Sequence, residues 1–266
     1  MTLYAVGIDI GSLTTKAAVM ENGSKIASVL INTGDEAEDS ARQAMERVIQ
    51  VAGIDGHREY YVVTTGAGGK AVSFGNKQKA ITTCLARGIS YAAAGTQGII
   101  DIGAESSTVV KLNERGRVTD WANHDKCAAG TGIFLQQMAK LMALSLDEMS
   151  ELSLNSRSGA EITGTCAVFA ESEVISHIHR LPPTPVPDII LGIYLSVTSR
   201  IKTMCKRIGV SGNIAITGGV ALNSGLVHTL TKELGTDIVI PEEPSCIAAL
   251  GAAVLAGEEA QKEASG

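Results

Sequence analysis

Two short segments of the 266-residue chain place an aspartate beside a turn of small residues. The first has the sequence Asp-Ile-Gly-Ser over 9–12, and the second has Asp-Ile-Gly-Ala over 101–104. Such turns present backbone N–H groups that bind phosphate oxygens, and a neighbouring carboxylate holds hydrated Mg²⁺ through one or two oxygens. Either turn alone is compatible with an ordinary hairpin, but its recurrence after 92 positions favours a paired phosphate site.

The residues in and beside the two turns have the chemistry that a nucleotide requires. Asp9 and Asp101 are expected to act as catalytic carboxylates that hold Mg²⁺ through water. Lys16 is expected to neutralise the transferred phosphate. The residues that we expect to contact phosphates are Gly11, Ser12, Thr14, Lys16, Gly103 and Ala104.

A third glycine segment lies between a strand-like run that ends at Thr217 and a helical stretch over 222–234. Glycines between a strand and a helix let a planar base or a phosphate approach the backbone closely. We therefore expect Gly218, Gly219 and Val220 to hold the adenosine part of a nucleotide.

The glycine-rich segment Thr65–Ala71 suggests two other nucleotide motifs, and both are rejected. A P-loop requires glycine where Thr64 stands and serine or threonine where Ala71 stands. A Rossmann turn requires an acidic residue about 20 positions downstream, and residues 60–100 contain no Asp or Glu. Neither motif is therefore assigned to this segment.

Two of the five cysteines, Cys127 and Cys166, come at or just before predicted helix starts. The helix dipole and the free N–H groups at such a start favour a thiolate or an anionic cluster. We expect the other three to be buried side chains without a chemical role, and these are Cys84, Cys205 and Cys246. An odd number of cysteines excludes a fully paired set of intrachain disulfides.

The two aspartate turns begin a repeated pattern of secondary structure. Each predicts strand, turn, strand, glycine-containing turn and strand, and an amphipathic helix over 35–51 follows the first. A repeat of about half the chain predicts two similar α/β lobes. We expect residues 1–93 with 249–266 to form the N-terminal lobe, and residues 94–248 to form the C-terminal lobe that carries Cys127 and Cys166.

The composition excludes some classes of protein. A net charge of −6 and an aromatic content of 3% argue against a nucleic-acid binder. The chain has no run of about 18 apolar residues, and its first residues lack the basic region of a signal peptide. We therefore expect a cytoplasmic protein that has neither nucleic acid nor membrane as a partner.

Three segments together carry a resemblance to a known superfamily. Asp9–Ser12, Asp101–Gly103 and Thr217–Val220 resemble the phosphate-one, phosphate-two and adenosine motifs of the actin-like ATPases, which include sugar kinases, actin and the heat-shock ATPases. The resemblance implies an α/β fold of two ribonuclease-H-like domains, with ATP or ADP in the cleft between them.

The cysteine segments Asp125–Gly132 and Thr165–Val174 resemble one branch of that superfamily over essentially the whole chain. The branch comprises the ATP-dependent activators of 2-hydroxyacyl-CoA dehydratases and the related ATPase subunits of benzoyl-CoA reductase. It implies one [4Fe–4S] cluster bound by Cys127 and Cys166 of both subunits of a homodimer, with Gly130 in the nucleotide site. Such a cluster usually takes four thiolates, and two cysteines in each of two symmetric subunits supply four.

The activity that this resemblance implies is ATP-driven electron transfer. The electron would pass from a ferredoxin or flavodoxin to a partner iron–sulfur dehydratase or reductase. One alternative is a small-molecule kinase, which needs a substrate-binding insertion for which 266 residues leave little room. Another is a filament-forming or chaperone-like ATPase, which would not require Cys127 and Cys166.

The second turn departs from the pattern of the better-known activators. They carry Asp-Ile-Gly-Gly-Gln-Asp where this chain has Asp-Ile-Gly-Ala-Glu-Ser over 101–106, and they carry arginine where Ile133 stands. We expect either that Glu105 replaces the glutamine as the group that orients the attacking water, or that hydrolysis is slow. The departures leave the identity of the partner enzyme open.

Residues 60–100 carry basic side chains without any acidic residue. The basic residues are Lys70, Lys77, Lys79 and Arg87. One interpretation is a docking patch for an acidic electron donor, and the other is a set of scattered solvated side chains.

Four of the six prolines fall within residues 181–187, which predicts a loop. An amphipathic helix is predicted over 190–208, and Gly209 is expected to end it.

Overall fold

The computed structural model describes residues 4–55, 58–125, 130–163 and 166–265, and the chain divides into two compact units. The first unit consists of Met1–Thr96, Leu112–Thr119 and Pro241–Gly266, and the second consists of Gln97–Lys111 and Asp120–Ile240. The lobe boundaries that the sequence suggests, after residues 93 and 248, stay a prediction.

The first unit contains a five-stranded sheet with the strand order β3-β2-β1-β4-β5. The strands are β1 (Tyr4–Ile10), β2 (Thr14–Glu21), β3 (Ser24–Asn32), β4 (Tyr60–Thr65) and β5 (Lys77–Gln78). Strand β1 pairs antiparallel with β2 and parallel with β4. Every β1 residue after Tyr4 is buried, as expected of a central strand that is covered on both faces.

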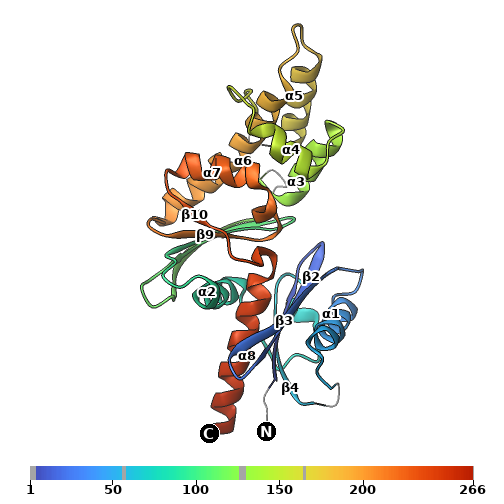
Figure 1. Ribbon diagram of the computed structural model, residues 1–266, viewed down its shortest axis with the longest axis vertical. Coiled ribbons are helices and arrows are strands. Elements are labelled where there is room, and N and C mark those ends of the chain that lie inside the picture. The colour runs from blue at the N-terminus through green and yellow to red at the C-terminus, as the bar shows by residue number, and fades with distance from the viewer. Residues whose placement is uncertain (1–3, 56–57, 126–129, 164–165, 266) are drawn as a thin grey trace. The chain divides into compact units, whose positions relative to one another are not determined.

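Helices cover both faces of this sheet (Figure 1). Helix α1 (Ala37–Ala52) packs on one face and α8 (Ile247–Ser265) packs on the other, and α2 (Ile81–Ala92) packs against α8. The helix predicted over 35–51 is therefore confirmed as α1. A Cβ at Gly7 would overlap the backbone of Ala249 and Ala253, so α8 lies directly against β1 and fixes its position.

The second sheet has the order β10-β9-β6-β7-β8, which repeats the arrangement of the first. Its strands are β6 (Gly98–Ile102), β7 (Ser107–Leu112), β8 (Val118–His124), β9 (Ile214–Thr217) and β10 (Ile238–Val239). Strand β6 pairs antiparallel with β7 and parallel with β9, as β1 does with β2 and β4. The predicted α/β repeat is confirmed.

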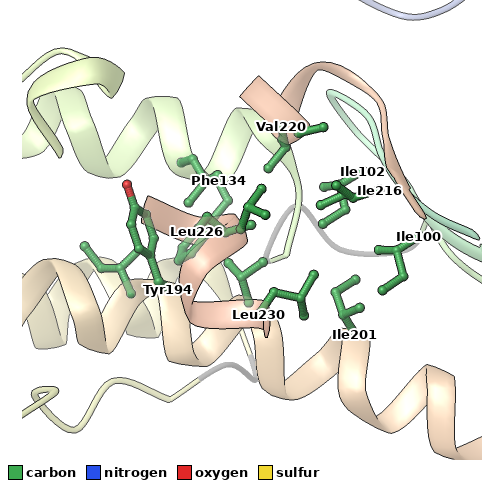
Figure 2. Close-up of a cluster of buried hydrophobic side chains, with 14 of the residues drawn as sticks. Ile100, Ile102, Phe134, Tyr194, Ile201, Ile216, Val220, Leu226 and Leu230 are labelled. Atoms are coloured by element: carbon green, nitrogen blue, oxygen red, sulfur yellow. The ribbon is translucent and has the colours of Figure 1, made fainter. Parts of the chain in front are cut away.

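Five helices follow the strands β6–β8 or lie between β9 and β10 in the described part of the second unit. They are α3 (Gly132–Leu141), α4 (Leu146–Ser153), α5 (Ala167–His179), α6 (Val186–Ile208) and α7 (Ser224–Leu234). Figure 2 shows labelled members of the core that these helices form with the sheet: Ile100, Ile102, Phe134, Tyr194, Ile201, Ile216, Val220, Leu226 and Leu230. Successive strand residues face opposite sides. Burial of Ile100 and Ile102 therefore turns Asp101 away from this core.

The long helix predicted before Gly209 is confirmed as α6, and Gly209 ends it in the left-handed conformation with φ +65°. The prediction that all of residues 181–187 form a loop is wrong at its end, because α6 begins at Val186. Pro187 is tolerated in the first turn because the N–H that proline lacks has no helical partner there. No helix in the described ranges is long and apolar enough to cross a bilayer.

Candidate functional site

The first turn joins β1 to β2 and places Asp9 and Lys16 side by side. The two residues are paired across the antiparallel strands, and Lys16 Nζ lies 3.5 Å from Asp9 Oδ2. The Gly11 N–H donates to the Thr14 carbonyl at 3.1 Å, which closes the turn, and Lys16 Nζ donates to the same carbonyl at 3.2 Å. Ser12 is exposed at the tip. All five residues expected here therefore lie in one small region of the first unit.

Thr33, directly after β3, holds this turn in shape. Its N–H donates to the Leu13 carbonyl at 3.0 Å, and its Oγ1 donates to the Gly11 carbonyl at 2.9 Å. A further contact of 2.9 Å joins Thr33 Oγ1 to Thr15 Oγ1. Sequence reasoning missed Thr33. The signal that could have identified it is a threonine directly after the strand that pairs with β2.

The second turn joins β6 to β7 in the same way. The Gly103 N–H donates to the Ser106 carbonyl at 2.9 Å, and Glu105 is exposed at the tip. Asp101 Oδ1 accepts a hydrogen bond of 2.7 Å from Thr217 Oγ1. Thr108 stands opposite Asp101 on β7, where the first unit has Lys16 opposite Asp9. The lysine of the first turn is therefore not repeated.

The start of α3 is bonded to the second turn. The N–H groups of Gly132 and Ile133 donate to the carbonyls of Gly103 and Ala104, each at 2.9 Å. Ser107 Oγ donates to the Gly130 carbonyl at 2.7 Å, so Gly130 also lies beside the turn. Cys127, three residues before Gly130 in the sequence, lies outside the described residues.

The predicted adenosine segment lies against the end of β6. Gly218 has φ +85°, and a Cβ there would overlap the Ile102 carbonyl. Gly219 has open space where a Cβ would stand, whereas Val220 is 7% exposed and packs into the core. Gly219 thus leaves the backbone accessible next to the second turn, whereas Gly218 packs closely against the end of β6.

The segment that begins at Thr65 has the same place in the first unit. Thr65 stands in register with Asp9, as Thr217 does with Asp101. Gly66 also has φ +85°, and a Cβ there would overlap the Ile10 carbonyl. A short 3₁₀ helix follows each segment, at Gly69–Ala71 and Gly219–Leu222. The two segments are therefore alike in the structure, and the signal that sequence reasoning missed is a Thr-Gly pair after a buried strand in both halves.

Cys166 is the N-cap residue of α5, as predicted. Its side chain is half-buried and makes no hydrogen bond that caps the helix. The two apolar residues that follow in the first turn are exposed, Val168 at 66% and Phe169 at 63%. The thiol therefore sits at a helix start beside an apolar surface.

The remaining three cysteines are buried, as predicted. Burial raises the pKa of Cys84 to about 12. It raises the pKa of Cys205 and of Cys246 to about 11. These thiols stay protonated near neutral pH, which disfavours a role as metal ligands.

The basic side chains of residues 60–100 are largely neutralised by α8. Lys77 Nζ lies 2.5 Å from Glu259 Oε2, and Lys79 Nζ lies 3.0 Å from Glu259 Oε1. Arg87 pairs with Glu258. Three of the four basic side chains thus lie beside carboxylates of α8, a long-range contact that the sequence does not reveal, and the docking patch stays a prediction.

Each unit thus has a tight turn with a carboxylate at its base, and the first unit adds a lysine beside that carboxylate. Among the described residues, no group of three His, Cys, Asp or Glu side chains is placed to hold a metal ion. Hydrated Mg²⁺ does not need such a group, because it keeps several waters and takes one or two carboxylates.

Comparisons with known proteins agree with this chemistry. Residues 6–256 match the BadF/BadG/BcrA/BcrD ATPase family. The chain is 40% identical over 261 residues to the 2-hydroxyisocaproyl-CoA dehydratase activator of Clostridioides difficile, which covers 98% of this chain and 97% of that protein. It is 30% identical over 240 residues to a benzoyl-CoA reductase subunit of Thauera aromatica, which covers 88% of this chain and 84% of that protein.

The fold agrees with a solved structure of the 2-hydroxyisocaproyl-CoA dehydratase activator from Clostridium difficile with bound ADPNP. The TM-score is 0.90 at 39% identity, over 98% of this chain and 97% of that one. The actin-like ATPase fold predicted from the sequence is confirmed.

Proposed function

The chain belongs to the BadF/BadG/BcrA/BcrD ATPase family, and we propose that it uses ATP hydrolysis to drive an electron into a partner enzyme. The donor, a ferredoxin or flavodoxin, loses one electron, and an iron–sulfur dehydratase or reductase gains it. Two relatives are a dehydratase activator and a subunit of benzoyl-CoA reductase. ATP binding and hydrolysis belong to the family, and the electron transfer, the cluster and the dimer are what we add.

The observation that carries the proposal is the link between the second turn and the segment that follows Cys127. Two backbone hydrogen bonds of 2.9 Å join Gly132 and Ile133 to Gly103 and Ala104. A shift of the turn on losing a phosphate is therefore passed directly to the start of α3. In an ATPase built in this way, hydrolysis can shift the start of α3, the helix that follows Cys127 in the sequence.

The residues of the proposed nucleotide site have separate roles in binding Mg²⁺, neutralising phosphate charge, orienting water and contacting the nucleotide. Asp9 and Asp101 hold hydrated Mg²⁺, and Lys16 neutralises phosphate charge. Glu105, exposed at the tip of the second turn, orients the water that attacks the γ-phosphorus as ADP leaves. Phosphate contacts come from Gly11, Ser12, Thr14, Gly103 and Ala104, and the other nucleotide contacts come from Gly130, Gly218, Gly219 and Val220.

Cys127 and Cys166 are the proposed ligands of a [4Fe–4S] cluster, which supplies one-electron redox chemistry when bound. Cys166 fits this role because its half-buried thiol stands at the start of α5, where the free backbone N–H groups of the first turn can face an anionic cluster. Two cysteines in one chain make half of a four-thiolate set. A second copy of the chain therefore supplies the other half.

The homodimer also accounts for the apolar surface beside Cys166. Val168 and Phe169 are 66% and 63% exposed in the single chain, which is unusual for large apolar side chains at the start of a helix. Contact with a second copy at the shared cluster would bury both residues and keep water away from the thiolates. We therefore assign this surface to the dimer interface.

The proposal is tested by anaerobic purification with iron analysis and light scattering. We expect about four irons per dimer in the wild type, and loss of iron in Cys127→Ala and Cys166→Ala. Cys205→Ala is the matched control, because Cys205 is buried in α6 and should leave the iron content unchanged. Iron-free wild-type protein that phosphorylates a sugar or an acid would support the kinase alternative.

A further inference from the structure

Each unit places a buried threonine one strand away from its turn aspartate. In the second unit Thr217 stands in register with Asp101, and its Oγ1 donates a 2.7 Å hydrogen bond to Asp101 Oδ1. In the first unit Thr65 stands in the same register with Asp9. Side chains in register on neighbouring strands project to the same face. Thr65 therefore has the place beside Asp9 that Thr217 has beside Asp101.

The two hydroxyls differ in what they contact. Both threonines are 0% exposed. Thr217 is bonded to Asp101, whereas Thr65 Oγ1 has no oxygen or nitrogen partner among the described residues and has only the Cys84 thiol, a weak hydrogen-bonding group, beside it. A buried hydroxyl without a strong partner destabilises the fold, and such groups usually have a functional explanation. Valine has nearly the same shape and would fill this position without that penalty.

Lys16 accounts for the difference between the units. Its Nζ lies 3.5 Å from Asp9 Oδ2, so the Asp9 carboxylate already has a cationic neighbour. In the second unit the equivalent position is Thr108, whose hydroxyl contacts Asn123 Oδ1 at 3.0 Å instead. A bound phosphate competes with Asp9 for Lys16, because an ammonium group interacts strongly with phosphate oxygens.

We propose that Thr65 is a positioning residue that bonds the Asp9 carboxylate when Lys16 turns to the nucleotide phosphate. Thr217 holds Asp101 in the equivalent way throughout. In both units the hydroxyl donates to one carboxylate oxygen and leaves the other for a water of hydrated Mg²⁺. This inference rests on the function proposed above for Asp9, Asp101 and Lys16.

The glycine after each threonine makes this arrangement possible. Gly66 and Gly218 both have φ +85°, and each presses its Cα against a carbonyl of the central strand, that of Ile10 or Ile102. A Cβ at Gly66 would also lie 2.5 Å from Asp9 Oδ1. Only glycine therefore lets β4 end so close to the Asp9 carboxylate.

The first test compares Thr65→Val with Thr65→Ser. We expect Thr65→Val to lower kcat for ATP hydrolysis about ten-fold or more, the usual effect of losing a hydrogen bond to a charged group. Its Tm should stay the same or rise, because a hydroxyl without a strong partner is removed. Thr65→Ser keeps the hydroxyl and should retain most of the rate, although it loses a buried methyl group and some stability. Thr65→Val should thus be the more stable but less active variant, and Thr65→Ser should be the less stable but more active one.

Thr198→Val is the matched control for loss of a buried threonine hydroxyl. Thr198 is 0% exposed, and its Oγ1 donates to the Leu195 carbonyl within α6, so its loss should leave kcat unchanged. A second measurement follows the rise in Tm that ADP produces with and without Mg²⁺. Thr217→Val should need about ten-fold more Mg²⁺ to reach the wild-type rise, and Thr217→Ser should restore it.

Wild-type kcat in Thr65→Val would overturn the inference, and so would equal losses of rate in the valine and serine variants. Asp9→Asn separates this inference from the proposed function. If Asp9→Asn hydrolyses ATP at the wild-type rate, the proposed role of Asp9 is wrong. If Asp9→Asn is inactive while Thr65→Val is fully active, only the role of Thr65 is wrong.

Discussion

The backbone N–H of Gly132 donates a 2.9 Å hydrogen bond to the carbonyl oxygen of Gly103. A Cβ at position 132 would lie 3.1 Å from that oxygen and 3.4 Å from Val220 Cγ2. The start of α3 therefore reaches the second turn so closely because position 132 carries no side chain.

A larger residue at this position should disturb ATP hydrolysis. We expect Gly132→Val to lower kcat/KM for ATP by about 10-fold to 100-fold, because a displacement of about 1 Å at a catalytic site has effects of this size. Gly257→Ala is the control, since its Cβ would lie 3.6 Å from Ala5 Cβ in an ordinary contact made by α8. Steady-state assays of both variants test this, and unchanged kinetics in Gly132→Val would contradict it.

The cysteines of iron-free protein should differ in their reaction with iodoacetamide. Burial raises the pKa of Cys84 to about 12 and that of Cys205 and Cys246 to about 11, so almost none of these thiols is ionised at about pH 8. Cys166 is half-buried at the start of α5 and should be alkylated before these three. Peptide mass spectrometry measures the order, and rapid labelling of Cys84 in the folded protein would be the contrary result.

The network around Glu259 should make stability depend on pH in the acid range. Hydrogen bonds from Lys77 and Lys79 lower the Glu259 pKa from 4.5 to about 2. A lowered carboxyl pKa contributes stability that is complete above about pH 4.5 and is lost as the pH falls towards 2. We expect Glu259→Gln to lower Tm by about 2–4 °C at pH 7, and the difference from wild type to vanish near pH 2. Exposed Glu242→Gln is the control, and a difference that persists at pH 2 would refute the assignment.

Charge reversal within residues 60–100 should affect stability rather than electron uptake. Lys79→Glu places two carboxylates together at Glu259, where the lysine now lies 3.0 Å away, so its Tm should fall. Lys70 is exposed, and Lys70→Glu should leave Tm unchanged. Thermal denaturation is compared with the rate of reduction by ferredoxin or flavodoxin. A Lys79→Glu variant with wild-type Tm and slow reduction would instead support the docking interpretation.

The two turns can be predicted from the sequence because their signal is local. An aspartate next to the end of a buried strand and the glycine that follows the strand stand within three positions of each other in Asp9–Gly11 and Asp101–Gly103. The strand-turn-strand patterns around them are equally local. The place of Cys166 at the start of α5 is predictable for the same reason.

The contacts that sequence reasoning misses join distant parts of the chain. The bond from Thr33 to Gly11 spans 22 positions, and that from Thr217 to Asp101 spans 116. Neither follows from local periodicity, because strand order decides which ends of strands meet. The role of Thr65–Gly66 in the repeat is missed for another reason. This pair resembles a pair in the second half of the same chain, and it does not match a P-loop or Rossmann pattern.

The ion pairs between β5 and α8 have a consequence for the evolution of the family. Lys77 and Glu259 are 182 positions apart, yet each lowers the electrostatic cost of the other. A sequence in which one of the two charged residues is replaced leaves the other without its opposite charge. Replacements at the two positions should therefore occur together. Positions 77 and 259 are therefore expected to covary across homologous sequences, whereas exposed Lys70 should vary independently.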